Sequence, residues 1–113
     1  MAVPLYQAKA ELFRTLGHPA RIRVLELLCE RPYAVHELRE QVAIEASNLS
    51  QQLGVLRRAQ MVVSSRREGE VVYSISVPEV RDLLLAGRRI LAQLAPDVDL
   101  DWAGPVAADG GSS

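Results

Sequence analysis

The stretch Glu45–Ala59, EASNLSQQLGVLRRA, predicts the element around which the rest of the chain is arranged. Wound as an α-helix, it places Leu49, Leu53 and Leu56 on one inward stripe, because positions i, i+4 and i+7 share a helix face. The remaining side chains are mostly short and polar: Ser47, Asn48, Ser50, Gln51, Gln52, Gly54 and Arg58. Such side chains can hydrogen-bond to the base edges and phosphates of a DNA major groove. A solvent-exposed helix face would show the same pattern, so both interpretations stay open for this stretch taken alone.

Gly54 interrupts the polar side of this predicted helix. In a helix interior, glycine costs roughly 1 kcal/mol relative to alanine. Close approach of another surface at this position would compensate for that cost.

The composition predicts one globular domain. A chain of 113 residues, 49% apolar and 24% charged, is long enough for one hydrophobic core and too short for two ordinary domains. We expect a domain over residues 1–95 and an acidic, partly disordered tail over residues 96–113, with a local anchor at Trp102. Apolar runs are interrupted by charges and the N-terminus lacks a signal-peptide pattern, so we expect a cytoplasmic protein without a membrane span. The single cysteine, Cys29, cannot form an internal disulfide, which agrees with a reducing compartment.

Charge is distributed unevenly along the chain, although the net charge is only -1. Four of the 14 acidic residues and none of the 13 basic ones follow Pro96, which leaves 10 acids and a net charge of +3 before it. The segment 46–67 contains four arginines and no acid: Arg57, Arg58, Arg66 and Arg67. Local positive charge therefore coincides with the predicted polar helix.

Apolar spacing predicts five helices and one hairpin. The helices cover Leu5 to about Gly17, Pro19–Glu30, Ala34 to about Gln41, Glu45–Ala59, and a last helix that opens at Pro78. Met61–Arg67 and Val71–Ser76 read as two strands joined by Glu68-Gly69-Glu70. The order α-α-α-α-β-β-α, mainly α with a small β-hairpin, predicts a winged helix-turn-helix. In such a fold the fourth helix enters the major groove, and Arg66 and Arg67 of the wing contact the backbone or the minor groove.

Two segments resemble the ArsR/SmtB (arsenic-repressor type) family of winged-helix transcriptional regulators. They are LGHPARIRVLELL (Leu16–Leu28) and SNLSQQLGVLRRAQMVVSSRREGEVVYSI (Ser47–Ile75), and the order of elements matches from about Leu5 to Leu94. The resemblance implies a homodimeric repressor that binds a double-stranded inverted-repeat operator and is released by an inducer.

The resemblance also assigns residues. It implies a DNA-binding set that joins the recognition-helix segment, its arginines and the wing: Ser47, Asn48, Ser50, Gln51, Gln52, Arg57, Arg58, Arg66, Arg67 and Gly69. Many members of the family have His at the position of Gln52. Dimerisation through the first and last helices would use their apolar positions: Leu5, Leu12, Val80, Leu83, Leu84, Gly87, Ile90, Leu91 and Leu94.

The usual metal-sensing residues of that family are missing. Ala34 and His36 occupy the positions of its paired cysteines, and the last helix contains no His. We therefore predict no metal site and no cofactor. A small inducer or a redox signal of unidentified nature remains, and for Cys29 the spacing favours a packing role over a sensing one.

The sequence bears on three functional classes. The sequence favours a DNA-binding transcriptional regulator, most simply a repressor. The alternative is a winged-helix module that binds proteins without binding DNA, which the near-neutral charge would allow. We expect no enzyme, because the sequence shows no nucleophile-base pairing and no phosphate-binding glycine loop.

Overall fold

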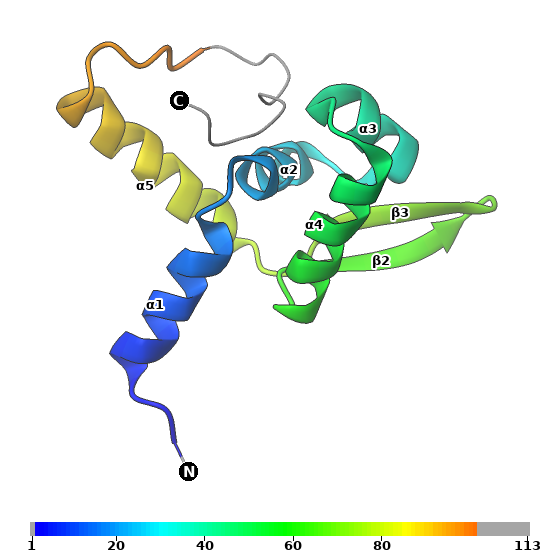
Figure 1. The fold of residues 1–113 in the computed structure, drawn as a ribbon, viewed down its shortest axis with the longest axis horizontal. Helices are drawn as coiled ribbons and strands as arrows, with labels where there is room; N and C mark the ends of the chain where they lie inside the picture. The colour runs from blue at the N-terminus through cyan, green and yellow to red at the C-terminus, as the bar shows by residue number, and fades with distance from the viewer. Residues whose placement is uncertain (1, 102–113) are drawn as a thin grey trace.

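The computed structural model describes residues 2–101, which form five helices and a three-stranded sheet (Figure 1). In chain order the elements are α1 (Leu5–Leu16), α2 (Pro19–Glu30), β1 (Tyr33–Ala34), α3 (Val35–Val42), α4 (Ala46–Arg58), β2 (Val62–Arg67), β3 (Glu70–Ile75) and α5 (Glu79–Leu94). The predicted winged helix-turn-helix, with its helices in the predicted order, is confirmed.

Local chemistry explains where α2 and α3 begin and end. The His18 imidazole accepts a hydrogen bond from the backbone N–H of Ala20 (3.1 Å), so it caps α2, and Pro19 occupies the first turn. Pro32 follows the end of α2 and prevents its continuation. Ala43 ends α3 with a left-handed backbone (φ 59°), and it is the first of the three residues, 43–45, that lead into α4. This short turn is the helix-turn-helix connection.

The sheet contains a strand that the sequence analysis did not predict. β1 pairs with β3, which also pairs with β2, in the antiparallel order β1-β3-β2. Two residues between Pro32 and α3 are too few to show an apolar alternation. The hairpin turn is also tighter than expected: Glu68 and Gly69, both with positive φ, make the turn, and Glu70 already pairs with Arg67.

The core lies where α2, α3 and α4 meet the sheet. Its largest fully buried side chains are Leu25, Leu38, Leu49, Leu56, Val24, Val42 and Val62. Burying one such leucine contributes about 1.5–3 kcal/mol. α1 and α5 contribute only Leu16 and Val80 as buried residues.

The apolar positions of α1 and α5 therefore divide into two groups. Val80, which was predicted for the dimer interface, is 5% exposed and belongs to the core, so its side chain is already covered within one chain. Leu83 and Leu84 are partly buried against that core. The remaining apolar side chains predicted for the dimer interface are exposed: Leu5, Leu12, Ile90, Leu91 and Leu94.

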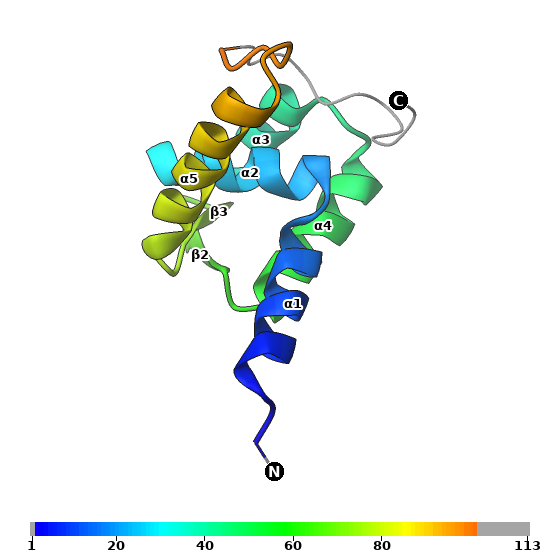
Figure 2. The ribbon, with the colours of Figure 1, turned by 90° about the vertical axis from the view of Figure 1, so that its left-hand side faces the viewer.

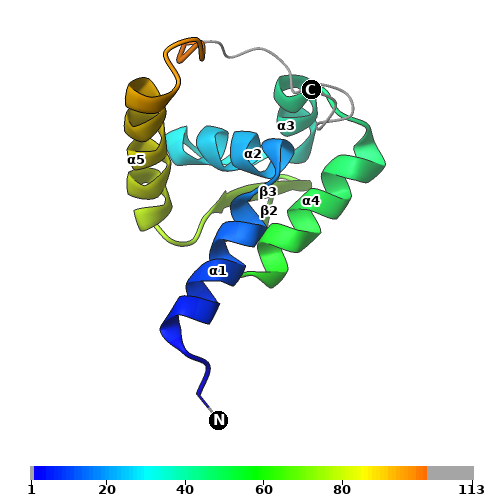
Figure 3. The same cartoon turned by 60° about the vertical axis from the view of Figure 1, so that its left-hand side comes forward.

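α1 and α5 lie on the side of the molecule opposite the hairpin tip (Figure 1), and Figure 2 looks onto that side. α1 reaches away from the other elements, and α5 runs beside α2 (Figures 2 and 3). After α5 the chain turns back, where the Arg88 guanidinium donates to the carbonyl of Leu100 and pairs with Asp101 (3.2 Å). The predicted anchor at Trp102 lies outside the described residues. Within residues 2–101, no helix is both long and apolar enough to cross a membrane.

The cap of α2 predicts a pH-dependent stability. Burial, and then the neighbouring Arg21, hold the pKa of His18 below its ordinary value of 6.5. The neutral imidazole accepts the cap hydrogen bond and the protonated one cannot, so the contribution of the cap is complete above pH 6.5 and lost as the pH falls through the lowered pKa. We expect acidification from about pH 7.5 to about pH 5 to cost the wild type about 1 kcal/mol more than His18→Asn. Urea unfolding at both pH values measures this difference, because asparagine caps at either pH. Equal pH dependence of the two proteins would contradict the assignment.

Candidate nucleic-acid interface

α4 presents one buried and one exposed side. Leu49, Leu53 and Leu56 are at most 2% exposed, so the predicted inward stripe is confirmed. Ser47, Ser50 and Gln51 are exposed, Asn48 is half-buried, and Arg57 and Arg58 are exposed at the end of the helix. In Figure 1, α4 crosses the end of the β2–β3 hairpin that lies away from its tip. A polar helix face and a hairpin therefore stand together, as a winged helix-turn-helix requires.

Gln52 does not lie on that exposed face. Its side chain is buried, with 5% exposure, and its Oε1 accepts a hydrogen bond from Nη1 of Arg21 (2.9 Å). Its Nε2 donates to Oδ1 of Asn48 (2.9 Å), and Arg21 also donates through Nε to the carbonyl of Thr15 (2.6 Å). In this structure the amide of Gln52 points inward, because an arginine from α2 binds its oxygen, and its predicted place in the DNA-binding set stays a prediction. Arg21 lies 31 positions away in the chain, so helical periodicity could not reveal this partner.

Gly54 has a neighbour in the same helix. A Cβ atom added at Gly54 would lie 3.2 Å from Nη1 of Arg58, whose guanidinium folds back over this turn. Arg58 belongs to the same helix, so this contact is not the close approach of another surface that the sequence suggested.

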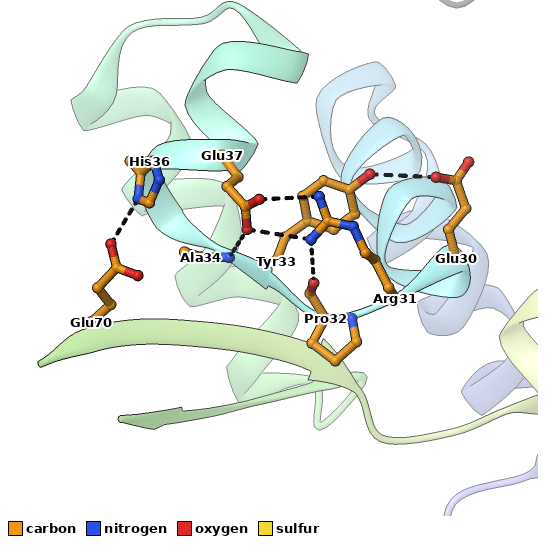
Figure 4. A network of polar contacts seen from close by, with 8 residues as sticks. All are labelled: Glu30, Arg31, Pro32, Tyr33, Ala34, His36, Glu37 and Glu70. Atoms are coloured by element: carbon orange, nitrogen blue, oxygen red, sulfur yellow. Dashed lines mark hydrogen bonds and ion pairs between the residues drawn. The ribbon is translucent and has the colours of Figure 1, made fainter. Parts of the chain in front are cut away.

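The wing carries its own polar contacts. Nη1 of Arg66 donates to the carbonyl of Gly69 (3.1 Å), which holds this guanidinium at the hairpin tip. Nδ1 of His36 lies 3.1 Å from Oε1 of Glu70, and this contact connects α3 to the wing (Figure 4). Arg67 is exposed beside Arg66. The wing tip is therefore tied to the helix-turn-helix by side chains as well as by the sheet.

The four arginines form two pairs that the fold separates. Arg57 and Arg58 end α4 just before β2, and Arg66 and Arg67 end β2 at the wing tip. A six-residue strand spans about 20 Å, so the two pairs lie at opposite ends of the hairpin. Two separated positive points suit two separate phosphate contacts better than one continuous patch.

A cluster around Arg31 fixes the turn from α2 into α3 (Figure 4). Arg31 pairs with Glu37 (3.1 Å), donates to the carbonyl of Pro32 (2.8 Å) and stacks 3.8 Å from the ring centre of Tyr33. Glu37 also accepts from the backbone N–H of Ala34 (2.9 Å). Arg31 and then this N–H lower the pKa of Glu37, and Glu37 raises the pKa of Arg31. The sequence analysis missed this cluster, although its spacing of six residues and the acid in the first turn of α3 are visible in the sequence.

The remaining candidate residues do not gather into a metal site. Within residues 2–101, no three His, Cys, Asp or Glu side chains converge as metal ligands would. Cys29 is half-buried against the core, and burial raises the pKa of its thiol despite the lowering effect of Arg81. The Cys29 thiol is therefore a weak nucleophile at neutral pH.

The fold and this surface define a winged helix-turn-helix protein of the DNA-binding type. Residues 18–64 match the model of the bacterial regulatory proteins of the arsR family. Rv0081, an HTH-type transcriptional regulator of Mycobacterium tuberculosis, is 54% identical over 95 residues, which cover 83% of each chain. The protein belongs to the arsR family of bacterial transcriptional regulators.

Other relatives and solved structures agree with this membership. The biofilm growth-associated repressor of Xylella fastidiosa is 36% identical over 77 residues, which cover 68% of each chain. The crystal structure of Rv0081 superposes with a TM-score of 0.76 at 52% identity, over 85% of this chain and 97% of that one. The crystal structure of the transcriptional repressor BigR from Xylella fastidiosa superposes with a TM-score of 0.71 at 34% identity, over 75% of this chain and 87% of that one.

The contact between Gly54 and Arg58 predicts the effect of a substitution. Gly54→Ala should stabilise the protein by up to about 1 kcal/mol, because alanine favours the helix and only the flexible end of Arg58 has to shift. Urea unfolding measures the gain, and the same substitution in an Arg58→Ala background serves as the control without the obstacle. A loss of stability in the wild-type background beside a gain in the control would show that the guanidinium is held rigidly.

Proposed function

We propose that the protein is a homodimeric repressor that binds an inverted-repeat operator in double-stranded DNA and is released by a signal still to be identified. The observation that carries the proposal is the exposed polar face of α4 standing beside a wing that bears Arg66 and Arg67. The relatives in Xylella fastidiosa are named repressors, which supports repression as the outcome. A regulator of this kind acts in the cytoplasm and catalyses no reaction.

The proposed DNA contacts divide by chemistry. Ser47, Ser50 and Gln51 are exposed on α4 and offer hydroxyl and amide groups to base edges in the major groove. Phosphates are contacted by the arginines at the end of α4 and on the wing: Arg57, Arg58, Arg66 and Arg67. Gly69 lets the wing tip approach the DNA backbone. Specificity then resides in α4 and affinity largely in the arginines.

The proposed dimer would use the uncovered apolar residues of α1 and α5. Leu5 is 69% exposed, Ile90 52% and Leu94 76%, and both helices lie on the side away from the wing (Figure 2). Leu12 and Leu91 extend this apolar surface, and a Cβ atom added at Gly87 would meet no atom of residues 2–101 within 4 Å. Covering such residues with a second copy removes them from water and leaves both α4 helices free for successive half-sites about 34 Å apart.

The proposed signal that releases the protein from its operator is neither a metal ion nor the oxidation of a thiol. Cys29 is half-buried with a raised pKa, which supports the packing role expected from its spacing. A small inducer that alters the contact between two copies would change the separation of their α4 helices and thereby the affinity for the operator.

DNA binding predicts a strong salt dependence and separable roles for α4 and the wing. A duplex selected by the wild type from a random pool serves as the operator. If a dimer neutralises about 6–10 phosphates, its affinity should fall about 10³–10⁵-fold between about 50 mM and 200 mM salt. Gln51→Ala should cost about 1–3 kcal/mol on this duplex and relax base preference, whereas Arg67→Ala should weaken all sequences equally. Fluorescence anisotropy measures both.

The matched control is Gln93→Ala, which removes an exposed glutamine of α5, away from the proposed DNA interface, and should leave the affinity for DNA unchanged. No enriched sequence in the selection, or unchanged affinity in a Gln51→Ala, Arg67→Ala double variant, would favour the alternative of a winged-helix module that binds proteins instead of DNA.

The proposed dimer predicts a change of molecular mass in solution. Ile90→Asp should shift the protein toward a monomer, because a carboxylate would have to be buried in the apolar interface. Ala92→Asp introduces the same charge on the other side of α5 and should leave the dimer intact. Sedimentation equilibrium measures both, and equal masses for the two variants would place the interface elsewhere.

A further inference from the structure

A chain of hydrogen bonds runs from α1 through α2 to the polar face of α4. The guanidinium of Arg21 donates to the carbonyl of Thr15 and to Oε1 of Gln52, at 2.6 Å and 2.9 Å. Nε2 of Gln52 donates to Oδ1 of Asn48 at 2.9 Å. Gln52 is the one polar residue in the buried set of the described chain, with 5% exposure, whereas Asn48 is half-buried at the edge of the polar face.

The direction of this chain is dictated by the groups in it. A guanidinium has only donors, so the oxygen of Gln52 has to face Arg21 and its amino group has to face Asn48. Asn48 therefore turns its oxygen toward Gln52 and its amino group away from it. An asparagine alone on a helix could present either end of its amide, whereas here the buried partners select one.

We propose that Arg21 and Gln52 are positioning residues that orient Asn48 as a hydrogen-bond donor to DNA. The inference rests on the proposed function, because it concerns how the same surface reads its operator. Asn48 is the third residue of α4, in the N-terminal part of the helix that meets base edges in helix-turn-helix proteins. Its amino group suits an acceptor on the DNA: O6 or N7 of guanine, O4 of thymine, or a phosphate oxygen.

This orientation changes what Asn48 recognises. Bidentate pairing with adenine requires an amide that donates and accepts at once. The oxygen of Asn48 is committed to Gln52, so that pairing is left to the exposed amide of Gln51. Because the Asn48 side chain is held in place before binding, less side-chain conformational entropy is lost when the protein binds DNA.

A double-mutant cycle tests whether Gln52 acts through Asn48. Gln52→Glu keeps an acceptor for Arg21 and removes the donor to Asn48. On the selected duplex we expect Gln52→Glu to lower the affinity of the wild type about tenfold. In an Asn48→Ala background we expect the same substitution to lower the affinity less than about twofold. The cycle cancels any direct repulsion between the new carboxylate and DNA, because that repulsion is present in both backgrounds. Equal fold-losses in the two backgrounds would overturn the proposal.

Two further variants secure the result. Arg21→Met removes the donors that orient Gln52 and leaves Gln52 itself unaltered. It gives the same cycle, so the test stands even if Gln52→Glu fails to fold in thermal unfolding. Asn48→Asp keeps an acceptor for Gln52 and offers no outward donor, so its loss of affinity should be at least that of Asn48→Ala. Affinity of Asn48→Asp near the wild-type value would show that the oxygen contacts the DNA, against the proposal.

Single base-pair substitutions across each half-site then identify the acceptor. A base acceptor predicts that Asn48→Ala loses discrimination at one base pair, and a phosphate acceptor predicts equal weakening on all sequences. Both results support an outward donor. If the wild type enriches no sequence, the proposed function itself fails. Enrichment by the wild type together with additive losses in the cycle refutes only the role of Arg21 and Gln52.

Discussion

Burial of Leu49, Leu53 and Leu56 is the constraint on which the rest of the structure depends. The three side chains occupy the core between α2, α3 and the sheet, so α4 has one rotational setting about its axis. Each fully buried leucine contributes about 1.5–3 kcal/mol, and a rotated helix would forfeit most of this contribution. Ser50 and Gln51 consequently face outward because the leucines face inward. The face proposed to read DNA is therefore set by the hydrophobic effect acting on the opposite side of the helix.

Polar contacts then fix details that burial leaves free. Arg21 anchors Gln52 from α2, and Arg31 with Glu37 anchors the turn from α2 into α3. The contact between His36 and Glu70 connects the same unit to the wing. These contacts are individually modest where they are exposed, because water screens them. Together they hold the helix-turn-helix and the wing in one arrangement, which a surface that must match the spacing of a DNA groove requires.

α1 and α5 differ from the other helices because most of their apolar side chains lie outside the core. The core of one copy covers Leu16 and Val80 and leaves the outer residues of both helices exposed. An amphipathic helix usually buries its apolar stripe, so this arrangement supports a second copy as the partner. Val80 is covered within the chain and Ile90 is uncovered, so one part of the apolar face of α5 packs on the core and another part is free for the proposed dimer.

The sequence by itself determined the helices, the hairpin and the outward side of α4, because each depends on local periodicity, on proline and glycine positions, or on a short turn. It did not reveal β1, because two residues carry no period, nor the partner of Gln52, because Arg21 lies 31 positions away. It also placed Val80 with the exposed leucines of α5, since a helix pattern shows which residues share a face and not how far a neighbour covers that face. Only the tertiary structure decided these points: pairing, burial and side-chain direction arise from segments brought together by folding. Gln52 illustrates the difference, because its position on α4 follows from the sequence, whereas its inward direction follows from an arginine on another helix.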